Sequence, residues 1–213
     1  MLIVELGALG SLRELLRRST LSDLSWAQRE DILQGVACGV EFLHAQSPII
    51  IHRDLKSSNI VLTETLVPKV ADFGLAQPTT DATSDGVGTL SCMPPELIRG
   101  DAITSWEAVD SYGVGCIAHD LAHVNTSEAP PVAAPEASGG AASTLTERDN
   151  RMALAALMAA SRTSGEPTHG RAVDSGVPEL LAHVVGLCLA ADPLARPSMT
   201  AVRTMLTRNT AAV

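Results

Sequence analysis

"IIIHRDLKSSNIVL", residues 49–62, places a polar loop between two apolar runs that are rich in β-branched side chains. The runs at residues 49–51 and 60–62 predict two short strands that flank the loop. On the loop, Asp54 precedes Asn59 by five residues, and Lys56 stands between them. A carboxylate, a cation and an amide on one short loop predict a site that handles a proton or a metal ion.

A second acidic position follows another predicted strand. The run PKVADFG, residues 68–74, predicts a short strand that leads to Asp72 and then to a glycine. Asn59 and Asp72 offer hard oxygen ligands that suit Mg²⁺. Asp54 can orient or deprotonate an incoming hydroxyl, and Lys56 can neutralise a phosphoryl group. This set, within 19 residues, fits phosphoryl transfer, although each residue taken singly is equally typical of turns and helix caps.

Composition limits the class of protein. The chain has 213 residues, of which 46% are hydrophobic and 2% aromatic, so we expect one globular unit with a core of Leu, Val, Ile and Ala. The net charge of −9 argues against a nucleic-acid or anionic-membrane surface. Four widely spaced cysteines indicate reduced thiols and a cytoplasmic, intracellular location. No apolar run reaches the roughly 18–20 residues of a membrane span, and residues 1–12 have no basic region typical of a signal peptide.

The remaining pattern is mainly helical. Residues 10–19 predict a short amphipathic helix, and a longer one begins at Ser25, where Ser25 and Gln28 match a capping box. Further helices are expected at about residues 107–124, 147–161 and 178–189, and after Ser198. Residues 75–95 predict a loop, and the low-complexity residues 126–145 predict an insertion. The expected fold class is therefore mainly α, with short β-hairpins around the polar loop.

Seven segments, in order along the chain, resemble motifs of eukaryotic protein kinases. Residues 52–59 resemble the catalytic loop, residues 72–74 the DFG motif, and residues 94–96, read as Pro-Pro-Glu, the APE motif. Residues 4–7 resemble the hinge that holds adenine, residues 88–93 the substrate loop, residues 110–115 the start of the central helix, and residues 192–197 the late arginine motif. The overall sequence pattern of these motifs is most similar to the tyrosine-kinase-like group of Ser/Thr kinases. The resemblance implies the large C-terminal lobe of a kinase, preceded by a remnant hinge strand.

The resemblance also implies roles. Asp54 would orient the substrate hydroxyl and take its proton, and Lys56 would contact the γ-phosphate of ATP. Asn59 and Asp72 would hold Mg²⁺. The implied ATP-binding residues are Val4, Glu5, Gly7, Lys56, Val61 and Asp72. The implied structural residues are His52 packed near Phe73, Glu96 paired with Arg196, and Arg53, Gly74 and Asp110.

The implied partner is a protein with a Ser or Thr hydroxyl. Lys56 two residues after Asp54, and Thr89 in the substrate loop, are similar to Ser/Thr kinases. Arg53 before Asp54 implies control by a phosphate on the activation loop. Its candidate positions, which are equally ordinary loop residues, are Thr79, Thr80, Thr83 and Ser84. The sequence does not indicate an oligomeric state.

Some kinase features do not occur in these 213 residues. We find no GxGxxG loop after a strand and no VAIK-like lysine. We therefore expect residues 1–6 to be the last strand of a small lobe with the start of the hinge, and residues 7–213 to be the large lobe. Because one charge-stabilising donor is worth about 10²–10³ in rate, we expect this polypeptide alone to be nearly inactive. Cys92 stands where an aromatic residue is frequent, which would loosen the substrate loop.

Two other interpretations stay open. The chain could be a non-catalytic kinase-like lobe that binds partner proteins. It could also be a small-molecule kinase, such as an aminoglycoside or choline kinase, which shares the H-x-D-x-x-x-x-N pattern. The Gly88-Thr89 loop, residues 94–96 and Arg196 argue against a small-molecule kinase, because in the family they form a platform for a protein substrate.

Overall fold

The computed structural model describes residues 5, 7–18, 24–83, 87–123 and 176–210. All of these residues belong to one unit by their internal contacts. Val4, Ser84 and the expected segments 126–145 and 147–161 lie outside the described residues. No described helix is both long enough and apolar enough to cross a membrane.

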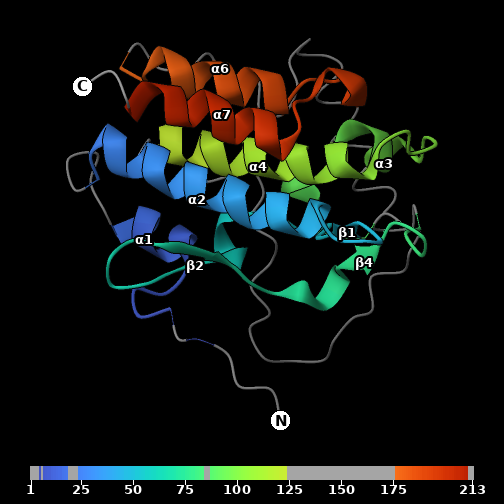
Figure 1. Ribbon diagram of the computed structural model, residues 1–213, viewed down its shortest axis with the longest axis horizontal. Helices are drawn as coiled ribbons and strands as arrows, with labels where there is room; N and C mark the ends of the chain where they lie inside the picture. Colours follow the sequence, from blue (N-terminus) through green and yellow to red (C-terminus); the bar gives the residue numbers. More distant parts are fainter. Residues whose placement is uncertain (1–4, 6, 19–23, 84–86, 124–175, 211–213) are drawn as a thin grey trace, which may run out of the picture. The chain divides into compact units, whose positions relative to one another are not determined.

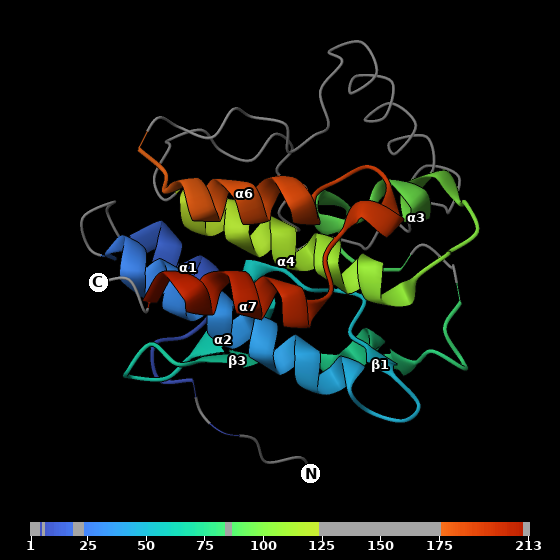
Figure 2. The same ribbon diagram turned by 45° about the horizontal axis from the view of Figure 1, so that its top comes forward.

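Four long helices lie side by side (Figure 1). They are α2 (Trp26–His44), α4 (Trp106–Ala122), α6 (Glu179–Cys188) and α7 (Met199–Thr210). Near the start of α2, Arg29 Nη1 donates to the carbonyl of Leu121 at 2.8 Å, and at the end of α2, His44 Nε2 lies 2.9 Å from Asp110 Oδ2. Helices α2 and α4 are therefore antiparallel. Figure 2 shows α7 against α2 and α6 against α4.

Local sequence signals fix the helix ends. Ser25 Oγ accepts from the Gln28 N–H at 3.2 Å, and the Gln28 side chain accepts from the Ser25 N–H at 2.9 Å, so the predicted capping box is confirmed. Ser198 Oγ accepts from the Ala201 N–H at the start of α7, also as predicted. These bonds satisfy N–H groups that have no partner within the helix.

The core is continuous through the helices and reaches the polar loop. The fully buried side chains include Ile32 and Val36 of α2, Ile117 of α4 and Leu206 of α7, together with Leu55 of the loop. Each such aliphatic side chain contributes about 1.5–3 kcal/mol when it leaves water. A smaller apolar cluster joins Met93, Leu97 and Val109.

The strands form two separate antiparallel pairs. β1 (Ile50–Ile51) pairs with β4 (Gln77–Pro78), and β2 (Ile60–Leu62) pairs with β3 (Pro68–Val70). The strands predicted from β-branched runs are thus present. The prediction of loop throughout residues 75–95 is wrong in part, because the segment holds β4, the 3₁₀ turn Leu90–Cys92 and the first residue of α3 (Pro95–Arg99). These elements are too short to show a hydrophobic period.

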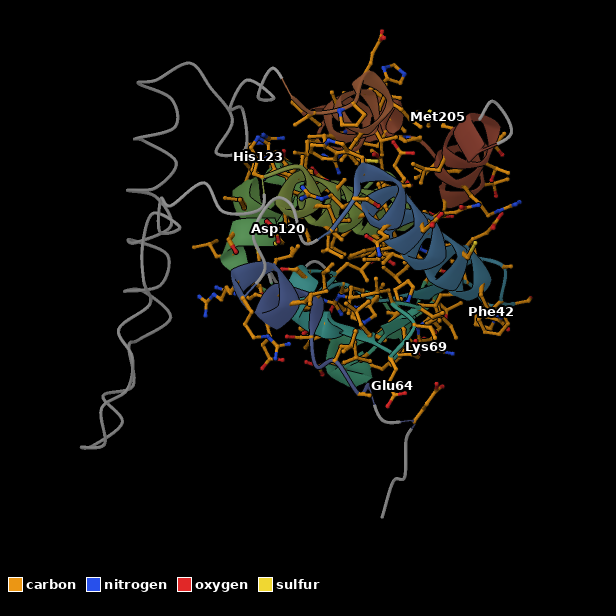
Figure 3. The ribbon with its side chains drawn as sticks, turned by 90° about the vertical axis from the view of Figure 1, so that its left-hand side faces the viewer. Phe42, Glu64, Lys69, Asp120, His123 and Met205 are labelled. Atoms are coloured by element: carbon orange, nitrogen blue, oxygen red, sulfur yellow. The ribbon has the colours of Figure 1, made fainter. Side chains whose placement is uncertain are left out.

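The first described residues pack on β2. The Leu9 N–H donates to the Leu62 carbonyl at 3.1 Å, and the Leu62 N–H donates to the Gly10 carbonyl at 3.0 Å. Helix α1 (Leu12–Arg18) follows and buries Leu12 and Leu16. In Figure 3, Glu64 and Lys69 mark the β2–β3 hairpin, while Phe42 projects from the outer side of α2.

Candidate active site

Asp54 is the centre of a hydrogen-bonded cluster. Its Oδ2 accepts from Lys56 Nζ at 2.6 Å and from Asn59 Nδ2 at 3.0 Å, and its Oδ1 accepts from the Thr89 N–H at 2.8 Å. Lys56 also donates to the Thr89 hydroxyl. The side chain of Asp54 is only 10% exposed. The fold therefore brings together four residues that span 36 positions of sequence.

These contacts keep Asp54 ionised. Burial acts to raise the pKa of Asp54, but the hydrogen bonds from Lys56 and Thr89 outweigh it and hold the pKa below its ordinary value. An ionised carboxylate accepts hydrogen bonds only, with about four lone-pair sites on its two oxygens. Oδ2 has two partners and Oδ1 has one, so Oδ1 keeps room for a further donor.

Asp110 binds the backbone of the loop that carries Asp54. The carboxylate of Asp110 is buried and accepts from the His52 N–H and the Arg53 N–H, each at 2.9 Å. His44 adds a third contact at 2.9 Å. Arg53 has a φ of 70°, a left-handed conformation that is unfavourable for a residue with a long side chain. Asp110 thus fixes a strained backbone immediately before Asp54.

Asp72 is carried next to Asn59 by strand pairing. Ile60 lies opposite Val70 in the β2–β3 ladder, and the Ala71 N–H donates to the Asn59 carbonyl at 2.9 Å. Asp72 is exposed and has a φ of 61°. Strained backbone conformations of this kind are frequent at functional sites, although Asp adopts them more readily than most residues. The Asn59 amide nitrogen donates to Asp54, and its Oδ1 accepts from the Ser58 hydroxyl at 3.5 Å, so Oδ1 keeps one further lone pair for a ligand.

Two predicted side-chain contacts are present. The rings of His52 and Phe73 lie 5.2 Å apart, tilted at 56°, and Phe73 is 49% exposed. Arg196 forms two parallel bonds with Glu96, at 2.7 and 2.8 Å, and all the participating groups are buried. This paired geometry is the strong form of an ion pair. It ties α3 to the segment before α7.

Gly7, at the end of the hinge-like segment, lies over β2. A Cβ added to Gly7 would be 2.7 Å from Val61 Cβ, so the segment passes closely over Val61 because it has no side chain there. Glu5 is exposed and pairs with Lys69 at 3.3 Å. Gly7 and Val61, which were predicted to share an adenine site, are thus neighbours.

Arg53 reaches the predicted loop of residues 75–95. Its guanidinium donates to the Gln77 side chain and, at 3.0 Å, to the Thr83 carbonyl. Trp106 covers it, with the guanidinium carbon 5.8 Å from the ring centroid. The Thr79 N–H donates to the carbonyl of Ile49, just before β1, at 2.8 Å, and the Thr80 hydroxyl donates to Asp81 at 3.0 Å. Thr83 is thus a phosphosite candidate that contacts this cation directly, through its backbone carbonyl.

Sequence reasoning missed three contributors. His44 contacts Asp110 from 66 positions away, and Ser111 donates to the Pro197 carbonyl at 2.9 Å. Gly113 lets α4 approach the loop, since a Cβ there would lie 2.7 Å from Leu55 Cβ. Gly113 and Gly115 stand inside the predicted helix of residues 107–124, and such glycines are tolerated where neighbours approach closely, so they were a local signal of this approach. The other two contacts have no local signal.

Comparison with known proteins shows the family. The protein kinase domain family matches residues 1–206. Interleukin-1 receptor-associated kinase 1 of Mus musculus is 42% identical over 119 residues, which are 49% of this chain and 17% of that protein. Cysteine-rich receptor-like protein kinase 8 of Arabidopsis thaliana is 34% identical over 199 residues, 89% of this chain and 27% of the relative. The chain belongs to the protein kinase family and spans less than a third of these relatives' length.

Proposed function

We propose that the chain carries the catalytic machinery of a protein Ser/Thr kinase, which transfers the γ-phosphoryl group of ATP to protein hydroxyls. The described unit would be the large helical lobe of that kinase. The single observation that carries the proposal is the cluster in which Lys56, Asn59 and Thr89 all bond to the carboxylate of Asp54. Membership of the protein kinase family supports it.

In this proposal Asp54 handles the substrate proton. Its lowered pKa keeps it ionised near neutral pH. The spare capacity of Oδ1 suits an incoming Ser or Thr hydroxyl, which would donate to that atom and so be aimed at the phosphoryl group. Lys56, held between Asp54 and Thr89, would offset negative charge on the transferred group. Catalysis would then rest on positioning and charge stabilisation.

The residues present fit a magnesium-bound nucleotide. Asn59 Oδ1 and the Asp72 carboxylate are hard oxygen donors on neighbouring strand ends, and Mg²⁺ commonly takes one or two protein ligands and completes its shell with water and phosphate oxygens. Bound Mg²⁺-ATP would supply the phosphoryl group and neutralise charge on it. Gly7 and Val61 would border the adenine, together with the backbone of Glu5.

Thr89 supports Ser/Thr over Tyr as the acceptor. Its hydroxyl and its N–H bond to Lys56 and Asp54, so the substrate loop is tied directly to the catalytic loop. We propose further that a phosphate on the activation segment, at Thr79, Thr80 or Thr83, would pair with Arg53. The reduced state of all four cysteines is consistent with an intracellular location, which is also part of this proposal.

We propose that these 213 residues act slowly by themselves. They contain no glycine-rich loop after a strand and no VAIK-like lysine. Each preorganised donor to the transition state is worth about 10²–10³ in rate, and here several are absent together. A non-catalytic role in binding partner proteins is the alternative that this observation favours.

A chimera tests the proposal. The small lobe of one of the relatives would be joined ahead of Glu5, and transfer from radiolabelled ATP to a mixture of Ser, Thr and Tyr peptides would be measured with Mg²⁺. We expect labelling of Ser or Thr peptides, and loss of at least about 10²-fold in the Asp54→Asn chimera. The 213-residue chain should label the peptides far less. A folded chimera with no transfer, or with transfer unaffected by Asp54→Asn, would overturn the kinase proposal.

A further inference from the structure

Two histidines lie together at the end of α4, outside the Asp54 cluster. His119 and His123 are four residues apart, so their side chains share one face of the helix. Their rings stack, with centroids 4.1 Å apart and planes tilted by 24°. His119 belongs to the last turn of α4, and His123 is its C-cap residue. Stacking by itself is a packing contact and requires no ligand.

One ring nitrogen of His123 is not explained by packing. Its Nε2 is buried and has no hydrogen-bond partner in the described part of the chain. The other ring nitrogen, Nδ1, lies 2.9 Å from the carbonyl oxygen of His119. Because a carbonyl oxygen only accepts, Nδ1 carries the proton, and in the neutral ring Nε2 holds a lone pair. A buried lone pair that receives no hydrogen bond is costly, and an ion or a water is the usual means of satisfying it.

Histidines that bind metal ions have this arrangement of ring nitrogens. A ligating histidine almost always donates its second ring N–H to a carbonyl, a carboxylate or a water, which orients the ring and raises its basicity. His123 makes that bond to the His119 carbonyl, so its lone pair is fixed at Nε2. Two histidines four residues apart on one helix face are also the spacing of a zinc-chelating pair.

We propose that His119 and His123 form a binding site for a divalent transition-metal ion such as Zn²⁺, which one ring nitrogen of each residue holds. Imidazole suits Zn²⁺, Cu²⁺ and Ni²⁺, whereas Mg²⁺ and Ca²⁺ prefer oxygen ligands. No third His, Cys, Asp or Glu among the described residues completes a set of three, so water would fill the remaining positions. This site would be independent of the proposed kinase function.

The geometry and the charge of this helix end suit such a cation. Two nitrogens that each lie about 2.0–2.1 Å from one zinc ion are about 3–3.4 Å apart, and the stacked rings approach this separation by small rotations. The χ2 torsion of histidine is broad, so the same rotations open the approach to the buried Nε2. The last carbonyls of a helix carry partial negative charge, and Asp120 adds a carboxylate in the same turn (Figure 3). A bound ion would therefore fasten the last turn of α4.

A zinc titration followed by NMR tests the site. The folded 213-residue chain, isotope-labelled at the ring nitrogens of its six histidines, would be titrated with ZnCl₂ in excess Mg²⁺. We expect His123 Nε2 and one ring nitrogen of His119 to respond together, at lower Zn²⁺ than any other histidine, while His123 Nδ1 keeps its proton. A response that begins at the exposed His183 would overturn the proposal. So would the absence of any response at His123, as expected for a buried water or for packing alone.

Variants assign the two ligands. His119→Gln removes one ring but keeps the backbone carbonyl that orients His123, and His123→Gln removes the other ring. We expect each substitution to weaken zinc binding by at least about 10-fold. His183→Gln, at an exposed histidine of α6, is the matched control and should bind zinc as the wild type does.

Melting curves give an independent measure of the same site. A ligand that binds only the folded state stabilises it, so zinc should raise the melting temperature of the wild type and of His183→Gln more than that of His119→Gln or His123→Gln. The curves without zinc also establish that each variant is folded, and His119→Gln decides alone if His123→Gln does not fold. Unchanged zinc binding in folded His119→Gln would contradict chelation by the pair.

Discussion

Single buried charges hold the loop of residues 52–59 and helix α3 in place. Asp110 accepts two backbone N–H groups of the loop, and Arg196 takes both oxygens of Glu96. Removing one member of a buried pair leaves the other uncompensated, which is costlier than losing a surface pair. The residues that matter most for stability near the site are therefore polar, although the core around them is aliphatic.

Glu96→Gln tests how much the buried ion pair between Glu96 and Arg196 contributes to stability. The amide keeps the shape of Glu96 but removes its charge, so buried Arg196 loses its counter-ion. We expect the free energy of unfolding in urea to fall by about 3–5 kcal/mol. Asp101→Asn is the matched control, because it breaks an exposed pair with Arg99 in the same region and should cost about 1 kcal/mol or less. Equal losses in the two variants would contradict a special role for burial.

Asp54 predicts an acid dependence of stability. Its folded pKa is lowered, so its charged contacts stabilise the fold above the unfolded pKa, near about 3.9, and this contribution is lost as the pH falls through that value toward the folded pKa. We expect the wild type to lose more unfolding free energy than Asp54→Asn between about pH 5 and pH 3. Urea titrations at the two pH values measure the difference. Lys56→Met should also make the fall in unfolding free energy between these pH values smaller than in the wild type. Equal falls in wild type and Asp54→Asn would show that Asp54 is not involved.

At the scale of elements, local patterns predicted most of what is present. The capping box at Ser25, the β-branched runs at 49–51 and 60–62, and Ser198 before α7 each carry a signal within a few residues. Strand β4 and helix α3 were missed because two to five residues give no period. The contact of His44 with Asp110 depends on how α2 and α4 pack, which no local pattern encodes.

Two glycines in helices should respond oppositely to alanine. In Gly113→Ala the new Cβ would lie 2.7 Å from Leu55 Cβ and 2.9 Å from its carbonyl oxygen, so α4 and the catalytic loop must separate. We expect the free energy of unfolding to fall by about 1–3 kcal/mol in Gly113→Ala. In Gly186→Ala, on exposed α6 surface, nothing lies within 4 Å, and we expect a gain of about 0.5–1 kcal/mol from helix propensity. Urea denaturation measures both, and changes of the same sign would refute the close-approach argument.

At the scale of the whole described unit, the site and the helices share one core. Leu55 of the catalytic loop belongs to the same buried cluster as Leu206 of α7 and Leu12 of α1. The two ends of the α2–α4 pair are also fastened by polar contacts, Arg29 with Leu121 at one end and His44 with Asp110 at the other. The composition predicted one aliphatic core, but not that the catalytic loop would be part of it.

A shared core predicts one cooperative unfolding transition, and the chain offers two natural reporters. Its only tryptophans are Trp26, at the start of α2, and Trp106, at the start of antiparallel α4 beside Arg53. In Trp26→Phe and Trp106→Phe, the remaining tryptophan reports one end alone. We expect its fluorescence midpoint in urea to coincide with that from circular dichroism. Leu206→Ala, added to each of these variants, leaves a cavity in the core at α7. We expect it to lower the free energy of unfolding by about 2–5 kcal/mol and so to lower both midpoints together. If Leu206→Ala moved only the Trp26 transition, the helical layer and the catalytic loop would be separate folding units, and the continuous core would not couple them.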